Sequence, residues 1–188
     1  MYPTSINEKY MELVINTLRD GGIIIYPTDS LYAIGCNALN NQAIERICRI
    51  KGINPAKTNL SIICHDISQS AEYARINNRA FRIMKDNLPG PFTFLLPAST
   101  TLPKVFKGRK TVGVRIPDNA IAREIAMRMD SPLLTTSIQW DTEDEAINPE
   151  SIAMRYSDTV DIVIDGGEGG TEPSTVIDIT CLLYTSPS

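Results

Sequence analysis

The chain has 188 residues, enough for one ordinary domain, and its shares of 43% hydrophobic and 21% charged residues are normal for a soluble globular protein. The net charge of −4 argues against a protein that coats nucleic acid indiscriminately. No apolar run approaches the roughly 20 residues of a membrane-spanning helix. The first residues lack the pattern of a secretory signal, so we expect a cytoplasmic protein.

Charge and potential metal ligands are distributed unevenly along the chain. Residues 104–115 carry five basic and no acidic side chains, whereas residues 141–150 carry five acidic and no basic ones. A basic surface that meets an anion is therefore compatible with the negative total. The cysteines at positions 36, 48, 64 and 181 and the single His65 lack the short spacing of metal ligands. We expect neither a metal site built from protein ligands nor disulfides.

Helical and strand patterns alternate along the chain. Apolar spacing predicts helices around residues 11–18, after Asn40, around 81–88, and around 121–129 with Asp118 as the N-cap. Runs rich in β-formers predict strands at residues 22–27, 60–64, 92–96, 111–116, 133–137, 161–165 and 174–179. This alternation predicts one α/β domain over residues 8–180. The last residues, CLLYTSPS at 181–188, do not continue the pattern, and we interpret them as a non-native or truncated tail.

The segment YPTDSLYAIGC, residues 26–36, is the first in which polar residues follow a predicted buried strand. Pro27 fixes one backbone angle, and Asp29 and Ser30 can bond nearby backbone N–H groups, so one interpretation is a capped turn. The other interpretation is the floor of a polar pocket, with the hydroxyls of Thr28, Ser30 and Tyr32 ready to bond a small polar ligand.

Two basic residues have the same double interpretation. Lys51 and Gly52 could end a helix, where a cation suits the dipole and glycine supplies the cap, or could approach a phosphate. Arg115 lies inside the apolar run TVGVRIP. A charge in a strand needs a partner, which is either a structural salt bridge or a bound carboxylate or phosphate.

The hydroxyls of TTSIQW (135–140) end a later strand, and GGEGGTEPSTV (166–176) is glycine-rich without matching a known nucleotide-binding motif. No nucleophile with a neighbouring base stands out: His65 lacks a triad partner, and Cys64 suits a buried strand. The residues therefore predict a positioning site, in which basic charges and hydroxyls hold an anionic, phosphate-bearing ligand.

Several motifs occur along the chain in this order: GGIIIYPTDSLYAIGC, RIKG, PGPFTFLL, TVGVRIPDN, LLTTS and GG…STVIDI. Together they resemble the YrdC/YciO family of threonylcarbamoyl-AMP synthases and their relatives, over about residues 8–180. The resemblance implies a twisted mixed sheet with flanking helices around a basic concave cavity. It implies that L-threonine, bicarbonate and ATP with Mg²⁺ give threonylcarbamoyl-AMP and pyrophosphate, for the t6A modification of tRNA. It also implies binding of double-stranded RNA in some members.

The resemblance also implies roles for particular residues. Lys51 and Arg115 would be catalytic. The threonine pocket would be formed by Thr28, Tyr32, Arg115 and Thr175. The nucleotide would be bound by Lys51, Lys57, Ser137, Gln139 and Ser174.

Three departures from the synthase pattern point to the YciO-like branch. The usual K-x-R is Lys51, Gly52, Ile53, so the second positive charge is missing unless Lys57 replaces it. The usual S-x-N ends at Gln139, one methylene longer than Asn, and Ala33 replaces a common glycine. The loss of one Arg–phosphate contact would cost about 1.5–3 kcal/mol.

Three functions remain open from the sequence. The first is a threonylcarbamoyl-AMP synthase or a weakened paralogue. The second is a non-catalytic protein that binds double-stranded RNA or the ribosome with the same basic cavity. The third is a metabolite-binding protein without turnover. RNA binding would weaken steeply with salt, and metabolite binding would stabilise the fold without turnover.

Overall fold

The computed structural model describes residues 7–58, 60–103, 106 and 110–180. These residues form seven helices: α1 (Glu8–Arg19), α2 (Asn41–Lys51), α3 (Ile67–Tyr73), α4 (Asn78–Asn87), α5 (Ala120–Met129), α6 (Glu143–Ile147) and α7 (Pro149–Tyr156). They also form eight strands: β1 (Ile24–Tyr26), β2 (Ala33–Asn37), β3 (Ser61–Ile63), β4 (Phe92–Pro97), β5 (Thr111–Arg115), β6 (Leu133–Ser137), β7 (Ile162–Val163) and β8 (Thr175–Asp178). None of the helices in the described ranges is long and apolar enough to cross a membrane.

All eight strands belong to one mixed sheet with the order β7-β1-β2-β6-β3-β5-β4-β8. The pairs β1–β7, β3–β5 and β4–β8 are parallel, and the other four neighbouring pairs are antiparallel. The predicted α/β fold, a single mixed sheet with flanking helices, is confirmed.

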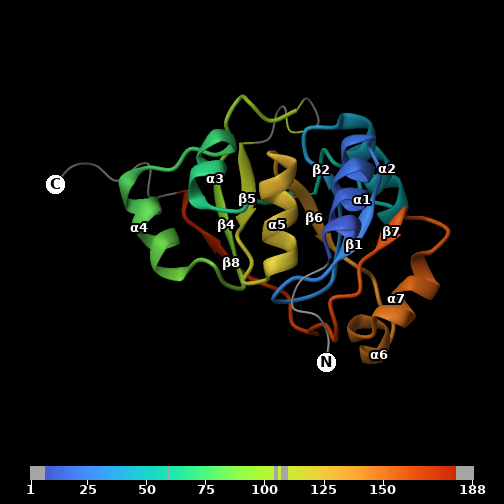
Figure 1. Cartoon of the computed structure of the whole chain (residues 1–188). Helices are drawn as coiled ribbons and strands as arrows, with labels where there is room; N and C mark the ends of the chain where they lie inside the picture. The colour runs from blue at the N-terminus through green and yellow to red at the C-terminus, as the bar shows by residue number, and fades with distance from the viewer. Residues whose placement is uncertain (1–6, 59, 104–105, 107–109, 181–188) are drawn as a thin grey trace.

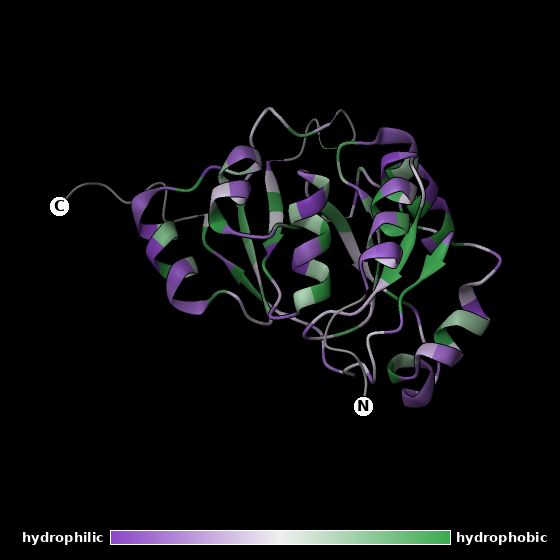
Figure 2. Cartoon of the chain, in the orientation of Figure 1, coloured by the Kyte–Doolittle hydropathy of each residue, from purple (hydrophilic) through white to green (hydrophobic). Residues whose placement is uncertain are grey.

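Helices cover both faces of the sheet. On one face α1 and α5 lie side by side, in front of the strands in Figure 1. They pack residues such as Met11, Leu18 and Ile125 against β1, β3 and β6. The opposite face packs against α2 and α4, and Figure 2 shows that the strands are largely hydrophobic whereas the helices turn polar residues outward. Each fully buried large aliphatic side chain contributes about 1.5–3 kcal/mol relative to exposure.

The predicted elements agree with the structure at most positions, with three differences. The N-cap of α5 is Asn119, whose side chain accepts from Ala122 N–H at 3.1 Å, and not Asp118 as predicted. Asp118 N–H instead donates to Asp29 Oδ2 at 2.7 Å. Strand β2 and the short helices α3, α6 and α7 were not predicted, and the strand expected at residues 161–165 is reduced to the two residues of β7.

Candidate ligand-binding site

A cavity of about 280 Å³ opens on the sheet face that carries α1 and α5. On this face Ile63 and Leu133 pack in the cluster formed with α5. Ser61 and Thr135, two residues away on the same strands, line the cavity instead. Because alternate residues of a strand share a face, the cavity is the part of this face that the two helices leave uncovered.

The floor of the cavity consists of small and hydroxyl-bearing residues. Ser61 of β3 lies in register with Gly113 of β5 and with Thr135 of β6. A Cβ atom at Gly113 would come within 2.3 Å of Ser61 Oγ. Thr93 of β4 also lines the floor, and its hydroxyl bonds the hydroxyl of Ser174 at 2.7 Å. The floor therefore presents hydroxyls to a ligand where the opposite face of these strands is apolar.

Arg115, at the end of β5, brings a positive charge into this cavity while only 8% exposed. Its Nη2 donates to Ser30 Oγ at 2.8 Å and lies 3.7 Å from Asp29 Oδ1. Its Nε is buried without a hydrogen-bond partner. Burial lowers the pKa of Arg115, although Tyr26 and the Asp29 carboxylate act in the opposite direction. Both predicted alternatives for Arg115 thus have a structural basis: a loose salt bridge, and a donor left for a ligand.

The loop between β1 and β2 shows why polar residues follow the strand. Thr28 Oγ1 donates to Leu31 O at 2.6 Å and accepts from Ser30 N–H at 3.0 Å. These contacts hold Ser30, which lines the cavity, against Arg115. Thr28 itself is not among the residues that line the cavity. The capped turn and the pocket therefore coexist, because the turn positions Ser30.

Lys51 ends α2 at the edge of the cavity. Its Nζ donates to Thr136 Oγ1 at 3.1 Å and to Ser137 O at 2.5 Å, and both acceptor residues line the cavity. Burial lowers the pKa of Lys51. The next residue, Gly52, is the left-handed C-cap of α2, so the helix-end interpretation of Lys51–Gly52 is confirmed.

Tyr32 packs against the glycine-rich loop at residues 166–174 and bonds its backbone. The ring is fully buried, and its hydroxyl donates to Gly167 O at 2.6 Å and accepts from Gly166 N–H at 3.0 Å. A Cβ atom at Gly169 would lie 2.6 Å from this ring. The same loop places Pro173 and Ser174 at the cavity. The structure thus does not place Tyr32 in the cavity wall, although it supports the loop that forms part of that wall.

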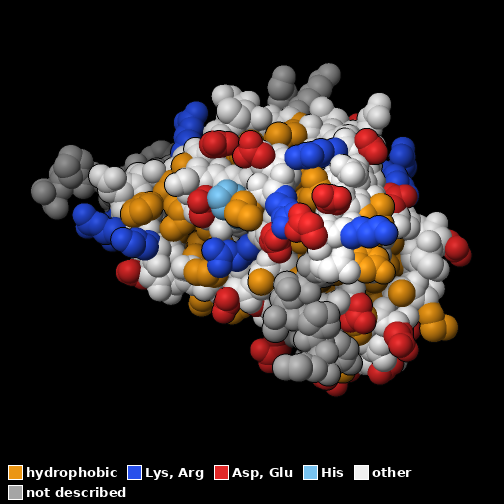
Figure 3. Space-filling view, in the orientation of Figure 1, with side chains coloured by type: hydrophobic (Ala, Val, Ile, Leu, Met, Phe, Trp, Pro, Cys, Tyr) orange, Lys and Arg blue, Asp and Glu red, His pale blue; other side chains and the backbone are white. Residues whose placement is uncertain are grey.

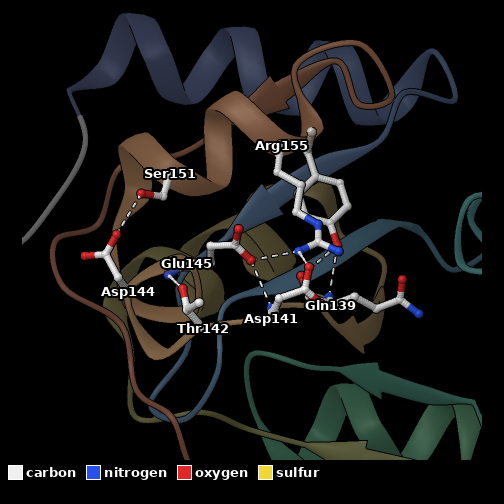
Figure 4. Close-up of polar contacts among 8 residues, drawn as sticks. Gln139, Asp141, Thr142, Asp144, Glu145, Ser151 and Arg155 are labelled. Carbon is white, nitrogen blue, oxygen red and sulfur yellow. Dashed lines mark hydrogen bonds and ion pairs between the residues drawn. The ribbon is translucent and has the colours of Figure 1, made fainter.

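Three other predicted residues lie away from the cavity lining. Lys57 is exposed in the loop after α2. Thr175 is exposed, and strand alternation places it on the face opposite to Ser174 and Val176, which line the cavity. Gln139 is exposed; its backbone N–H donates to the Tyr156 hydroxyl at 2.9 Å, and its side chain extends away from Arg155 in Figure 4.

Ser30, expected in the floor of a pocket, does line the cavity. The roles predicted for particular residues did not include Ser61, Thr93 or Thr135, which the structure also places there. Thr135 is the most notable, because it is 4% exposed and its hydroxyl is buried without a hydrogen-bond partner. The sequence did carry a signal for these residues: Ser, Thr or both occur within strands whose other residues are mostly apolar.

The charge of the cavity comes from few residues in the described part of the chain. Arg115 is the one charged residue among those that line it there, and Lys51 joins it at the edge. The basic stretch 104–115 contributes Arg115 and the exposed Lys110, while Lys104, Lys107 and Arg109 lie outside the described residues. The predicted tail at 181–188 also lies outside them.

Comparisons with known proteins give this geometry a context. The profile of the Sua5/YciO/YrdC family, described as "Telomere recombination", matches residues 16–185. The chain belongs to this family. The uncharacterised protein YciO of Escherichia coli K12 is 38% identical over 96% of this chain and 88% of that protein. The crystal structure of E. coli YciO superposes with a TM-score of 0.84, covering 93% of this chain and 85% of that one.

Relatives named as synthases are somewhat more distant. A putative threonylcarbamoyl-AMP synthase of Methanocaldococcus jannaschii is 34% identical over 92% of this chain and 81% of that protein. The structure of Pyrococcus abyssi Sua5 in complex with L-threonine has a TM-score of 0.83 and 31% identity, and covers 93% of this chain. This chain spans 52% of that longer protein. The family therefore includes proteins named threonylcarbamoyl-AMP synthase alongside uncharacterised YciO proteins.

Proposed function

We propose that this protein joins L-threonine, bicarbonate and ATP into threonylcarbamoyl-AMP, with release of pyrophosphate. The observation that carries the proposal is a buried arginine whose Nε has no partner, in a cavity lined by hydroxyls. Such a group recognises a carboxylate, because the guanidinium donates charge-assisted hydrogen bonds. The relatives named threonylcarbamoyl-AMP synthase, and the P. abyssi relative seen with L-threonine, support the choice of amino acid.

The threonine carboxylate would bind at Arg115, and cavity hydroxyls such as those of Ser61 and Thr135 would bond its polar groups. At about 280 Å³ the cavity is close to the lower end of the roughly 300–1,000 Å³ of small-molecule sites. We therefore place the amino acid inside it and the nucleotide at its open side, near Lys51 and Ser137.

The proposed reaction needs orientation more than a protein nucleophile. The threonine amine takes up bicarbonate to give a carbamate and water; a carbamate oxygen then attacks the α-phosphorus, and pyrophosphate leaves. The residues that line the cavity in the described part of the chain include no cysteine, histidine or carboxylate. Catalysis would come from holding the reactants together and from compensating charge with Arg115 and Lys51.

Mg²⁺ is proposed to arrive with ATP, held by phosphate oxygens. Within the described ranges, no group of three or more His, Cys, Asp or Glu residues is placed to hold a metal ion. The hydroxyl-lined cavity likewise offers no carboxylate, the ligand type that Mg²⁺ prefers. The cation would neutralise the leaving pyrophosphate, and Lys51 would contribute the protein's own charge there.

The test is pyrophosphate release from ATP, measured with and without L-threonine and with and without bicarbonate. We expect release only when both are present, and a loss of at least about tenfold in Arg115→Met, the cost of one hydrogen bond to a charged group. Arg46→Met is the matched control, because Arg46 pairs with Asp161 outside the cavity. Release that needs neither co-substrate would refute the proposal.

A second candidate function, RNA binding, is favoured by a separate surface. Arg79, Arg82 and Lys85 recur at helical spacing on α4, and Arg75 lies in the segment just before it; all four are exposed. Their side chains form no ion pair with any residue of the described ranges. Figure 3 shows basic side chains gathered at the α4 end of the molecule. A stripe of unpaired cations of this kind suits a phosphate backbone.

A further inference from the structure

Asp29 lies next to Arg115 but outside the cavity lining. Its side chain is 11% exposed, close to the 10% of the Arg115 side chain. Asp29 is not among the residues that line the cavity, whereas Arg115 and Ser30 are. A ligand in the cavity would therefore meet the arginine, and the carboxylate would act on that ligand only through the arginine.

One oxygen of Asp29 is fixed and the other is not. Oδ2 accepts from Asp118 N–H at 2.7 Å, which ties the β1–β2 loop to the segment after β5. Oδ1 is buried without a hydrogen-bond partner, and lies 3.7 Å from Arg115 Nη2. That distance is within reach of a Coulomb interaction but is longer than a hydrogen bond. The carboxylate thus compensates the charge of the arginine without bonding it.

The direct hydrogen bond of Arg115 Nη2 goes instead to Ser30 Oγ, at 2.8 Å. The guanidinium is therefore held at one end by a neutral hydroxyl while its Nε remains unbonded. A buried arginine without a nearby carboxylate would be strongly disfavoured. A bidentate pair, in contrast, would occupy two N–H donors of the guanidinium and leave fewer for a ligand.

We propose that Asp29 is a positioning residue that sets the orientation and the effective charge of Arg115, and so makes the cavity selective for L-threonine over simple carboxylates. This inference rests on the proposed function. With its charge largely compensated, Arg115 attracts a bare carboxylate weakly. A ligand gains affinity only when its remaining groups reach the cavity hydroxyls while its carboxylate meets the arginine in its fixed orientation.

The test compares binding of L-threonine and of acetate by NMR, through the Nε–Hε signal of Arg115, which is assigned by its loss in Arg115→Lys. Asp29→Asn keeps an oxygen that can accept from Asp118 N–H but removes the charge. We expect threonine affinity to fall at least about tenfold, because the guanidinium leaves its fixed orientation and loses one charge-assisted hydrogen bond to the ligand carboxylate. Acetate affinity should rise, because the arginine is no longer compensated.

Asp29→Glu provides a second variant that leaves no buried charge unpaired. It keeps the negative charge but moves the carboxylate by one methylene, so threonine affinity should fall while acetate affinity stays the same. If Asp29→Asn does not fold, this variant decides the question. The control is Glu8→Gln, which removes a carboxylate from the ion pair with Arg128 outside the cavity. It should change neither affinity.

Two results would overturn the proposal: unchanged affinity for both ligands in the Asp29 variants, or a parallel loss of both. A wild-type protein that does not bind threonine would refute the proposed function instead. The acetate titration would then still test Asp29, because tighter acetate binding in Asp29→Asn supports its role and unchanged binding contradicts it.

Discussion

Single residues at the cavity combine structural roles with the binding roles that we propose for them. Arg115 is held by Ser30 and compensated by Asp29, and it still presents Nε without a partner. Lys51 ends a helix and also bonds two residues of the cavity lining. Sequence patterns give such residues two competing interpretations, because the same side chain can make structural contacts and still have a polar atom that is free to bind a ligand.

The pH dependence of nucleotide binding tests the role of Lys51. Burial lowers its pKa in the folded protein below the ordinary value of 10.5. Burial of the charged Lys51 therefore lowers the free energy of unfolding. This cost is full below the lowered pKa of the folded protein and disappears as pH rises from that pKa toward 10.5. Binding that needs the charge is lost over the same interval.

We expect ATP affinity, measured by calorimetry, to decline on the alkaline side at a lower pH than an exposed lysine would give. Lys51→Arg should move the decline to higher pH, because arginine stays charged. The exposed Lys9→Arg is the control and should leave the profile unchanged. Identical profiles for the wild type and Lys51→Arg would show that Lys51 does not contact the phosphates.

At the scale of elements, the loop at residues 166–174 depends on Tyr32. Replacing Tyr32 with Phe would leave Gly166 N–H and Gly167 O without their shared partner. We expect a loss of unfolding free energy of about 1–3 kcal/mol, the cost of unsatisfied buried polar groups. Hydrogen exchange at Gly166 should also accelerate.

Chemical denaturation and hydrogen exchange measure these effects, with Tyr10→Phe as the control because Tyr10 is 63% exposed. Unchanged exchange at Gly166 in Tyr32→Phe would contradict the supporting role of the hydroxyl. Because Ser174 reaches the cavity from this loop, we also expect weaker threonine binding in Tyr32→Phe.

The elements that sequence patterns predicted well are those with long apolar periodicity, such as α1 and β5. Strand β2 was missed because its residues, AIGCN, follow the polar turn and include a glycine. Close packing explains why position 35 is a glycine, because a Cβ atom there would lie 2.7 Å from the Tyr26 ring. Helices α6 and α7 were missed because their acidic residues indicated only a charged segment.

Figure 4 shows what that acidic segment does. Arg155 of α7 pairs with Asp141 at 3.3 Å and with Glu145 at 2.8 Å, and Glu145 also accepts from Asp141 N–H. The backbone bond and Arg155 keep the pKa of Glu145 below its usual value. Such contacts between distant residues are invisible to local patterns, as are the hydroxyls that the sheet register gathers at the cavity.

At the scale of the whole molecule, charge is separated along the sheet. The exposed bases of α4 lie near the β4–β8 end, and the acidic residues around α6 and α7 lie near the β7 end (Figures 1 and 3). The net charge of −4 conceals this separation. A polyanion would therefore approach at the α4 end.

Replacing Arg79 and Arg82 with Ala tests RNA binding there. Binding of a duplex RNA, followed by fluorescence anisotropy over a salt series, should weaken for any sequence. The slope of log affinity against log salt should become shallower by about 1–2, one unit for each lost phosphate contact. The control Arg19→Ala removes a base on α1. Equal slopes in the wild type and the α4 variant would exclude this surface.

The central claim is that the cavity around Arg115 builds a threonine-containing nucleotide. The most direct measurement is the transfer of label from ¹³C-bicarbonate into a product containing both L-threonine and AMP, detected by mass spectrometry. We predict labelled threonylcarbamoyl-AMP from the wild-type protein, and a yield at least about tenfold lower from Arg115→Met. ATP binding without any labelled product, under conditions in which a known synthase forms it, would contradict the claim.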